Sequence, residues 1–221
     1  MWEIQAPHWR QAAQIAVECK TTVIVPIYPL APLGTAAEAV DGFTRSAIEA
    51  EAEERFGPAR LIGDSAGGQI ALSTALELRD KHSLTLPMTV LNSPALDLAL
   101  SNPDIPRVEK LDPWLHTGGI TVFAEAWRGE LSLEDPRVSP FFGDLHGLGP
   151  LCVLSGTHDI LNPDARLLVE RARTAGVYVT FHEQEGGLHT YSFMPTASGK
   201  KGNSAIIRAL AMPSTPELRV S

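Results

Sequence analysis

Short apolar runs of strand type alternate with segments of helical periodicity along almost the whole chain. The strand-like runs are residues 22–27, 59–62, 88–91, 151–155 and 177–182, and helical patterns cover residues 7–20, 35–56, 69–76, 162–176 and 202–212. Repeated β-α-β units with apolar strands predict a mostly parallel sheet with helices on both faces. With 221 residues and no repeat or dividing linker, we expect one α/β domain over residues 1–221, with a polar, disordered tail at 213–221.

Two local signals refine these expectations near the start of the chain. Thr35 and Glu38 have the spacing of a capping box, which opens a helix that runs to about Phe56. Pro26 cannot donate a hydrogen bond to a neighbouring strand. We therefore expect the strand at 22–27 to be irregular or to lie at an edge.

Charge and cysteine content exclude several classes of protein. The net charge of −8 and the isoelectric point near 5.3 argue against nucleic acid or an anionic membrane surface as the partner. No apolar run is long enough to cross a bilayer. Cys19 and Cys152 are isolated, and a buried, inert thiol is the simplest interpretation of Cys152. This cysteine usage favours a reducing, cytoplasmic compartment, and no signal peptide is visible at Met1.

The run Gly63-Asp64-Ser65-Ala66-Gly67-Gly68 has the G-x-S-x-G pattern of a nucleophile elbow. It follows a strand-like run and precedes a helical segment, which is the context that this turn requires. We expect glycine at 63 and 67 because a tight strand-to-helix turn brings backbone against backbone and leaves no room for Cβ. The pattern predicts that Ser65 is a nucleophile.

A serine nucleophile needs a base, and the base needs an acid, in the chain order serine, acid, histidine. The acid is expected just beyond a strand, where open parallel sheets place their chemistry. Asp159 follows the strand at 151–155 in this way. Asp164 is the competitor, but its place in the first turn of a helix capped by Asn162 has a structural explanation. We therefore prefer Asp159.

The expected base is His189, in the glycine-containing loop that follows the last strand. His182 lies within that strand and His158 stands beside the acid, so both fit structural or exposed positions better. Four more histidines lie in the wrong places along the chain for this role: His8, His82, His116 and His146. Neither His-x-x-x-His nor paired-cysteine spacing supports a metal site, so we expect no metal and no cofactor.

The stretch from residue 97 to 149 is long, rich in proline and without strand pattern, which is unusual inside a compact domain. It contains Trp114, Phe123 and Trp127, with a helix expected at 119–128. In one interpretation the aromatic side chains fill a small core of their own. In the other, the segment is a lid over the serine and some of the aromatic rings line an acyl pocket.

Together these motifs resemble the hormone-sensitive-lipase-like esterases of the α/β-hydrolase fold. The resemblance spans residues 22–193 and rests on the following runs: Tyr28-Pro29-Leu30-Ala31-Pro32, the elbow, Ser93-Pro94 with Asp97, Ser155-Gly156-Thr157-His158-Asp159, and Leu188-His189. It implies that Ser65 is the nucleophile, Asp159 the acid and His189 the base. It further implies that the amide of Ala66 is an oxyanion donor and that residues 98–135 form part of a cap, with no cofactor required.

One part of the family pattern is absent from the sequence. The family carries a His-Gly-Gly-Gly motif, which supplies further oxyanion amides, on a strand between those that match residues 22–27 and 59–64. We expect the sheet to lack this strand and the first strands, which leaves a gap that favours self-association. The preferred explanation is that Met1 is an internal methionine of a longer enzyme. The other is a true truncation, inactive or completed by a partner.

Three functions therefore stay open. The leading hypothesis is a serine carboxylesterase that hydrolyses small-molecule esters of short or medium acyl chains through an acyl-enzyme. An amidase or thioesterase is compatible with the same three residues, since a triad does not choose the leaving group. A non-catalytic binding protein that keeps the pocket without the complete oxyanion hole is the alternative outside the enzymes.

Overall fold

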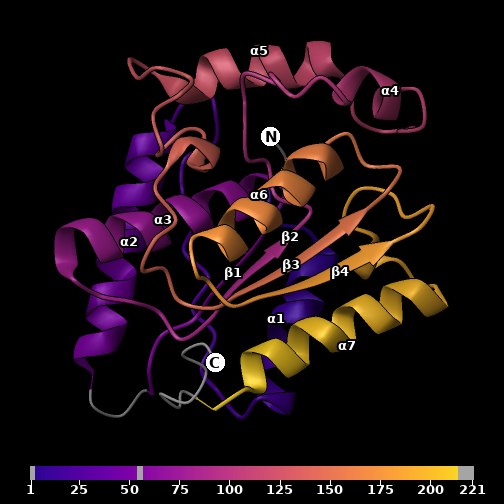
Figure 1. Ribbon diagram of the computed structural model, residues 1–221. Helices are drawn as coiled ribbons and strands as arrows, with labels where there is room; N and C mark the ends of the chain where they lie inside the picture. Colours follow the sequence, from indigo (N-terminus) through magenta and orange to yellow (C-terminus); the bar gives the residue numbers. More distant parts are fainter. Residues whose placement is uncertain (1–2, 54–56, 214–221) are drawn as a thin grey trace.

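The computed structural model describes residues 3–53 and 57–213, and within them four strands form one parallel sheet (Figure 1). The strands are β1 (Leu61–Asp64), β2 (Thr89–Asn92), β3 (Leu151–Gly156) and β4 (Val179–Gln184), in the spatial order β1-β2-β3-β4. Their registers pair Asp64 with Asn92 and Asn92 with Leu154. The carboxyl ends of β1, β2 and β3 therefore lie at one edge of the sheet, as expected for β-α-β units.

Helices cover both faces of this sheet, which confirms the expected α/β architecture. They are α1 (Ala6–Glu18), α2 (Ala36–Ala52), α3 (Ala66–His82), α4 (Ile105–Glu109), α5 (Thr117–Arg128), α6 (Asn162–Thr174) and α7 (Ala197–Ala211), with short 3₁₀ turns at Pro140–Phe142 and Tyr191–Phe193. Alternation along β3 assigns the faces. Leu151 and Val153 pack with side chains of α3 and α6, whereas Cys152 and Leu154 pack with α1 and α7. Cys152 is buried, as predicted.

The expected strand at 22–27 is wrong, because this segment has no strand assignment. Val23 packs against the α1–α7 side of the core, but Ile24 and Ile27 remain 54% and 76% exposed. A strand needs a neighbour to accept and donate its backbone hydrogen bonds. Within the described residues β1 pairs only with β2, so no ladder reaches residues 22–27.

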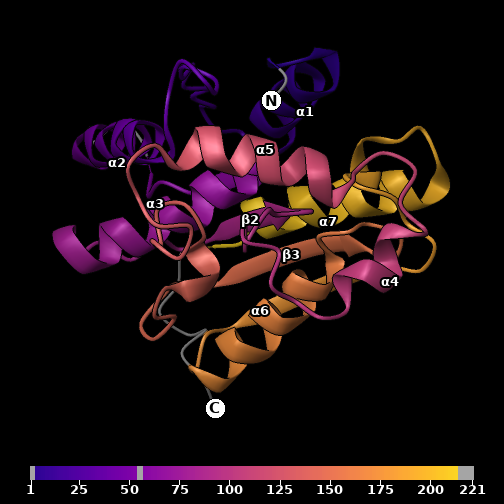
Figure 2. The ribbon, with the colours of Figure 1, turned by 90° about the horizontal axis from the view of Figure 1, so that it is seen from above.

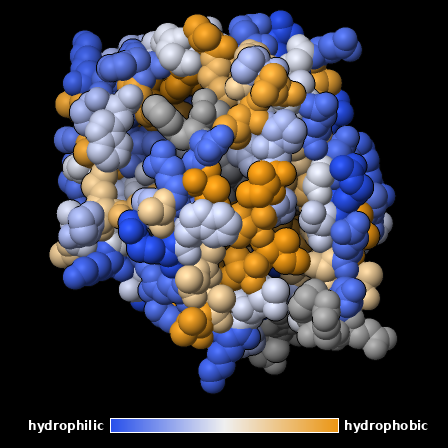
Figure 3. Space-filling view, turned by 180° about the vertical axis from the view of Figure 1, so that it is seen from behind, coloured by the Kyte–Doolittle hydropathy of each residue, from blue (hydrophilic) through white to orange (hydrophobic). Residues whose placement is uncertain are grey.

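Large apolar side chains are exposed along the same part of the chain. They belong to Trp9, Val17, Ile24, Ile27 and Leu33. Figure 3 shows apolar side chains gathered near the middle of the back of the molecule, the side on which α1 lies in Figure 1. This exposure is what a gap in the sheet would produce. Both the gap and self-association through it stay predictions.

Other element ends follow the sequence signals only in part. The Thr35 capping box is confirmed, since the Thr35 amide donates to Glu38 Oε2 at 2.9 Å and the Glu38 amide to Thr35 Oγ1 at 3.4 Å. The helix it opens ends at Ala52, and Phe56 lies outside the described residues. The tail expected at 213–221 likewise lies beyond the described part, apart from Pro213.

The predicted N-cap of α6 is displaced by one residue, from Asn162 to Leu161. The backbone amide of Leu161 already donates to the side chain of Asp159. The side chain of Asn162 turns inward, where its Nδ2 donates to Ser155 Oγ and to Glu183 Oε1. Tertiary hydrogen bonds thus replace the local cap.

Helices α4 and α5 form a layer of their own. They lie along the top of the molecule in Figure 1, and in the view from above α5 crosses in front of α3 and β2 (Figure 2). Both come from residues 98–135, hereafter the insert. Within the described residues, none of the helices combines the length and the apolar character needed to cross a membrane.

Candidate active site

Ser65 occupies a strained turn between β1 and α3. Its φ of 53° and ψ of −118° lie in a region that non-glycine residues rarely adopt. Besides the first bonds of α3 to its carbonyl, two backbone hydrogen bonds tie it to β2 and the segment that follows: the Ser65 amide donates to Asn92 O at 3.0 Å, and the Ala95 amide donates to Ser65 O at 3.0 Å. The turn places Ser65 at the carboxyl edge of the sheet and at the N-terminus of α3, as the elbow pattern predicts.

The glycines of the turn confirm the sequence argument at one of the two expected positions. A Cβ at Gly63 would lie 2.0 Å from Gly67 O, which the fold cannot accommodate. A Cβ at Gly67 would meet nothing within 4 Å, so the expectation for Gly67 is wrong. The second close approach is at Gly68, where a Cβ would lie 2.8 Å from Pro94 Cβ. The crowding comes from the segment after β2, which local sequence reasoning does not see.

Asp159 and His189 form a buried pair. His189 Nδ1 lies 2.9 Å from Asp159 Oδ2, and the other carboxylate oxygen accepts the Leu161 amide at 3.0 Å. Asp159 is fully buried and His189 is 8% exposed. Burial lowers the pKa of His189, but the carboxylates of Asp159, Asp64 and Asp112 outweigh it, and the pKa is raised above its ordinary value. The imidazolium is therefore stabilised in place.

Ser93 connects this pair with the elbow. Its hydroxyl accepts the Thr190 amide at 2.9 Å, next to His189, and its own amide donates to Leu154 O at 2.8 Å on β3. Ser93 follows Asn92, which holds Ser65. Within the described residues Ser65 Oγ and His189 are not joined by a hydrogen bond, although such contacts often tighten only when substrate binds. The sequence motif Ser93-Pro94 includes this residue, but only the fold shows that its hydroxyl binds the Thr190 amide.

Residues 3–193 match a family with the α/β-hydrolase fold. The chain belongs to the α/β-hydrolase family. It is 32% identical over 178 residues to a triacylglycerol lipase of Mycobacterium tuberculosis, covering 79% of this chain and 36% of the lipase. It is also 32% identical over 177 residues to an esterase of Acinetobacter venetianus, covering 79% of this chain and 58% of that protein. The chain thus spans between about a third and three fifths of these two relatives.

The solved structures confirm the predicted resemblance to hormone-sensitive-lipase-like esterases. The crystal structure of an esterase from the bacterial hormone-sensitive lipase family superposes with a TM-score of 0.81 at 26% identity. It covers 92% of this chain and 70% of that one. The parallel sheet and the helices on its two faces therefore have the α/β-hydrolase fold.

The competing residues lie elsewhere in the structure. Asp164 Oδ1 accepts a hydrogen bond from Asn102 Nδ2 at 2.9 Å, and burial raises the pKa of Asp164 to about 6. His182 is half-buried on β4, where burial and the nearby Arg208 and Lys201 lower its pKa. Within the described part of the chain, the side chains of Asp164 and His182 form no hydrogen bond or ion pair with Asp159 or His189, so the structure gives them no part in that pair.

His8 is a residue that sequence reasoning missed. It lies early in the chain, but α1 brings its Nε2 to 3.4 Å from Asp64 Oδ2, directly before Ser65. Its ring also stands edge-on to Phe193, with centroids 5.2 Å apart. No spacing in the sequence signals this contact, because α1 reaches the elbow only through the packing of α1 against the sheet.

The Ala66 amide is suited to receive negative charge. Ala66 is the first residue of α3, and the first N–H groups of a helix have no acceptor within the helix. The amide therefore lies next to Ser65 at the positive end of the helix dipole. It remains the candidate oxyanion donor.

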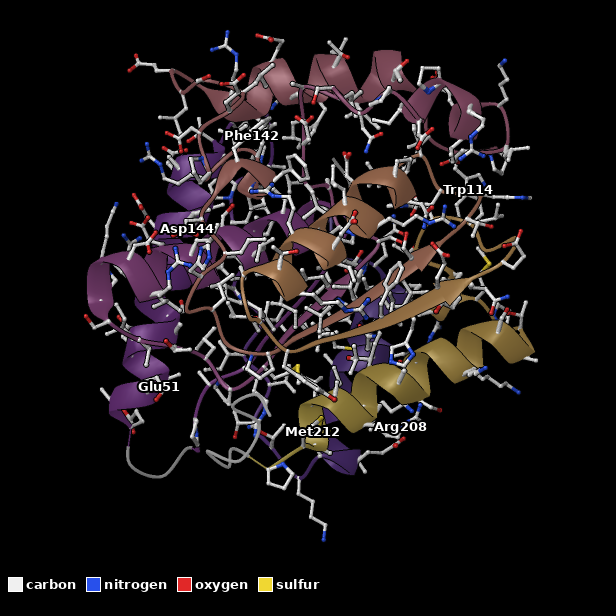
Figure 4. The ribbon with its side chains drawn as sticks, viewed as in Figure 1. Glu51, Trp114, Phe142, Asp144, Arg208 and Met212 are labelled. Atoms are coloured by element: carbon white, nitrogen blue, oxygen red, sulfur yellow. The ribbon has the colours of Figure 1, made fainter. Side chains whose placement is uncertain are left out.

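The aromatic side chains of the insert differ in how far they are buried. Trp127 is fully buried, donates from Nε1 to Gln69 Oε1 at 2.8 Å, and stacks on Phe123 with ring centroids 5.8 Å apart. Trp114 is 54% exposed, and Figure 4 places it below α4. Trp127 thus fits the interpretation of a packed excursion, whereas Trp114 is free to meet a ligand. The lid itself stays a prediction.

Proposed function

We propose that this chain carries the catalytic centre of a serine carboxylesterase, with Ser65 as nucleophile, His189 as base and Asp159 as acid. The observation that carries the proposal is the buried hydrogen bond of 2.9 Å between His189 and Asp159. It lies at the same edge of the sheet as the strained Ser65. The lipase and esterase relatives, and the hydrolase fold, support the same reaction.

In the proposed acylation step, Ser65 Oγ attacks the ester carbonyl carbon while His189 Nε2 takes the hydroxyl proton. Asp159 orients the ring through Nδ1 and stabilises the imidazolium, in agreement with the raised pKa of His189. The carbonyl oxygen becomes an oxyanion that the Ala66 amide receives. His189 then gives its proton to the alkoxide as the alcohol leaves.

Deacylation repeats these roles with water as the nucleophile. His189 removes a proton from water, which attacks the acyl-serine, and the proton returns to Ser65 as the carboxylic acid leaves. We assign short or medium acyl chains to the substrate, since the buried ring of Trp127 and the partly buried ring of Phe123 fill space under the insert. Amides and thioesters are the competing substrates.

The test is the release of p-nitrophenol from p-nitrophenyl acetate by the full chain and by Ser65→Ala. We expect a burst in the wild-type chain and loss of at least about a thousandfold in Ser65→Ala, because a triad without its nucleophile keeps only residual catalysis. Removal of one oxyanion donor lowers turnover by roughly 10²–10³, so an intact triad could still give a slow rate. Labelling of Ser65 by a fluorophosphonate is therefore measured together with the release of p-nitrophenol.

Ser132→Ala is the matched control, because Ser132 is an exposed serine of the insert. It should keep both the burst and the label. The proposal fails if the wild-type chain neither hydrolyses the ester nor takes the label at Ser65. That result would favour the non-catalytic binding protein. Preference for an anilide or a thioester over the matched ester would instead select an amidase or a thioesterase.

A further inference from the structure

Asp112, in the insert between α4 and α5, binds two separate parts of the chain. It is 4% exposed. Its Oδ1 accepts the amides of Trp114 and Leu115 at 2.9 and 3.0 Å, which are local bonds within the insert. Its Oδ2 accepts the amide of Ile160 at 2.9 Å, 48 residues further along the chain. One carboxylate thus ties the insert to the loop that follows β3.

Ile160 directly follows the proposed acid, Asp159. Its backbone amide differs from those of the neighbouring residues in where its hydrogen-bond acceptor lies. The Asp159 amide donates to Gly156 O, and the amides of Leu161 and Asn162 donate to Asp159 itself. Each of those acceptors belongs to the same turn. The Ile160 amide is buried with its residue and takes its acceptor from the insert. Without Asp112 this buried donor would lose its partner, which folded proteins rarely tolerate.

Apolar packing reinforces the same connection. Ile160 and Leu161 belong to one buried cluster with Ile105 of α4 and with Ala124 and Trp127 of α5. The insert therefore covers the acid turn with apolar side chains and reaches it with the carboxylate of Asp112.

Asp112 also acts on His189 through space. Three carboxylates favour the protonated form of that ring, those of Asp159, Asp64 and Asp112, and Asp64 also pairs with His8, which is charged only when it is protonated. Asp159 contacts the ring directly, and Asp112 adds a negative charge from the insert side. Charge separated from a ring by protein rather than by water is only weakly screened.

We propose that Asp112 is a positioning residue for the hydrolytic reaction, which holds the Asp159 turn through Ile160 and adds a carboxylate charge from the insert to the surroundings of His189. The inference rests on the proposed function of Ser65, Asp159 and His189. Asp112 does not touch substrate. Through it, the insert contributes to the geometry of the acid–base pair as well as to any cover over the site.

The experiment compares Asp112→Asn and Asp112→Glu with Asp97→Asn in the full chain. Asp97 is the matched control, since it is 1% exposed and its carboxylate also binds nearby amides, those of Ala99 and Ser101, but not the acid turn. We expect Asp112→Asn to lower kcat on p-nitrophenyl acetate about tenfold with little change in KM. The acid limb of its kcat/KM profile should move to lower pH, because removal of a negative charge lowers the pKa of His189.

Asp112→Glu separates charge from position. It should keep the acid limb near that of the wild-type chain while hydrogen exchange at the Ile160 amide becomes faster. Asp97→Asn should change neither the limb nor that amide. Lower thermal stability of Asp112→Asn with an unmoved acid limb and unchanged exchange at Ile160 would reduce Asp112 to a structural role and overturn the proposal.

The same measurements distinguish failure of the proposed esterase function from failure of the inference about Asp112. If the wild-type chain has no activity and no label at Ser65, the esterase proposal fails. The exchange rate of the Ile160 amide and an NMR titration of His189 then still decide whether Asp112 holds the turn and acts on the ring, since neither requires turnover. An unchanged rate and an unchanged titration in Asp112→Asn would overturn the inference in that case too.

Discussion

Strands β1 and β3 end at the same edge of the sheet, but they hold their functional residues in different ways. β3 pairs with β2 on one side and β4 on the other, and all six of its residues are buried. β1 pairs with β2 alone among the described strands, and all four of its residues are half-buried. The proposed acid thus follows a strand fixed by the interior, whereas the proposed nucleophile follows a strand held mainly from one side.

The same contrast extends to the charged pairs at the two strand ends. His189 and Asp159 have side chains that are 11% and 0% exposed, while those of His8 and Asp64 are 30% and 27% exposed. Water screens the second pair more strongly, so its interaction is weaker. The difference indicates that the acid–base half of the site is preorganised and that the serine half depends on a few local contacts.

The largest effect should come from truncation of a side chain on the better-packed strand. Leu154→Ala on β3 removes a fully buried side chain and should lower the free energy of unfolding by about 2–5 kcal/mol. Ile62→Ala on β1 is the matched change, at a half-buried position in the same cluster. It should cost clearly less, and urea unfolding of both variants measures the difference. Equal losses would contradict the contrast between the strands.

The second prediction concerns how β1, the less buried strand, holds Ser65 in place. Gly63→Ala on β1 places a Cβ against the Gly67 carbonyl and should destabilise the chain by about 1–3 kcal/mol, because backbone on both sides must move. The elbow should distort with it, so fluorophosphonate labelling of Ser65 should slow in proportion.

Gly67→Ala is the control, since its Cβ would enter open space. Its free energy of unfolding should stay within about 0.5 kcal/mol of the wild-type chain, as for substitutions away from crowded features. If both alanine variants behave alike, steric close approach is not what holds the elbow.

Much of this framework could be predicted from the sequence. Strands β1 to β4 and the elbow follow from local patterns, because apolar periodicity and glycine act over a few residues. The choice of Asp159 and His189 used the chain order serine, acid, histidine and the place of each residue after a strand, and their roles stay predictions. The run at 22–27 failed for the complementary reason. It is apolar enough for a strand, but a strand forms only where a neighbouring strand completes its hydrogen-bond ladder. Within the described residues no strand pairs with the other edge of β1, so residues 22–27 have no neighbour to pair with.

Contacts between distant segments could not be predicted from any one segment. Asp112 and Ile160 are 48 residues apart, and His8 reaches Asp64 only because α1 packs beside the sheet. Single-sequence patterns carry no signal for such pairs. The crowding at Gly68 by Pro94 is a further example, in which the glycine that matters differs from the one that the turn pattern suggests.

The smallest effect concerns the pair at the end of β1. The hydrogen bond to Asp64 raises the pKa of His8 above its ordinary value, against an opposing effect of burial. A raised pKa in the folded state means that the pair stabilises the fold fully below about pH 6.5, the ordinary histidine value, and that this contribution is lost as pH rises through the folded value. We expect His8→Gln to cost under about 1 kcal/mol near pH 5.5 and almost nothing near pH 9.

Thermal unfolding of the wild-type chain and His8→Gln at the two pH values measures that difference. His146→Gln is the control, because His146 and Asp144 pair at 2.6 Å with side chains 75% and 68% exposed, where water screens the attraction almost completely. A gap in Tm between wild type and His8→Gln that shrinks as pH rises would place α1 among the elements that hold the elbow electrostatically. A gap of equal size at both pH values would mean that His8 acts through uncharged contacts, such as its packing against Phe193, and the contrast between the two strand ends would then be one of packing.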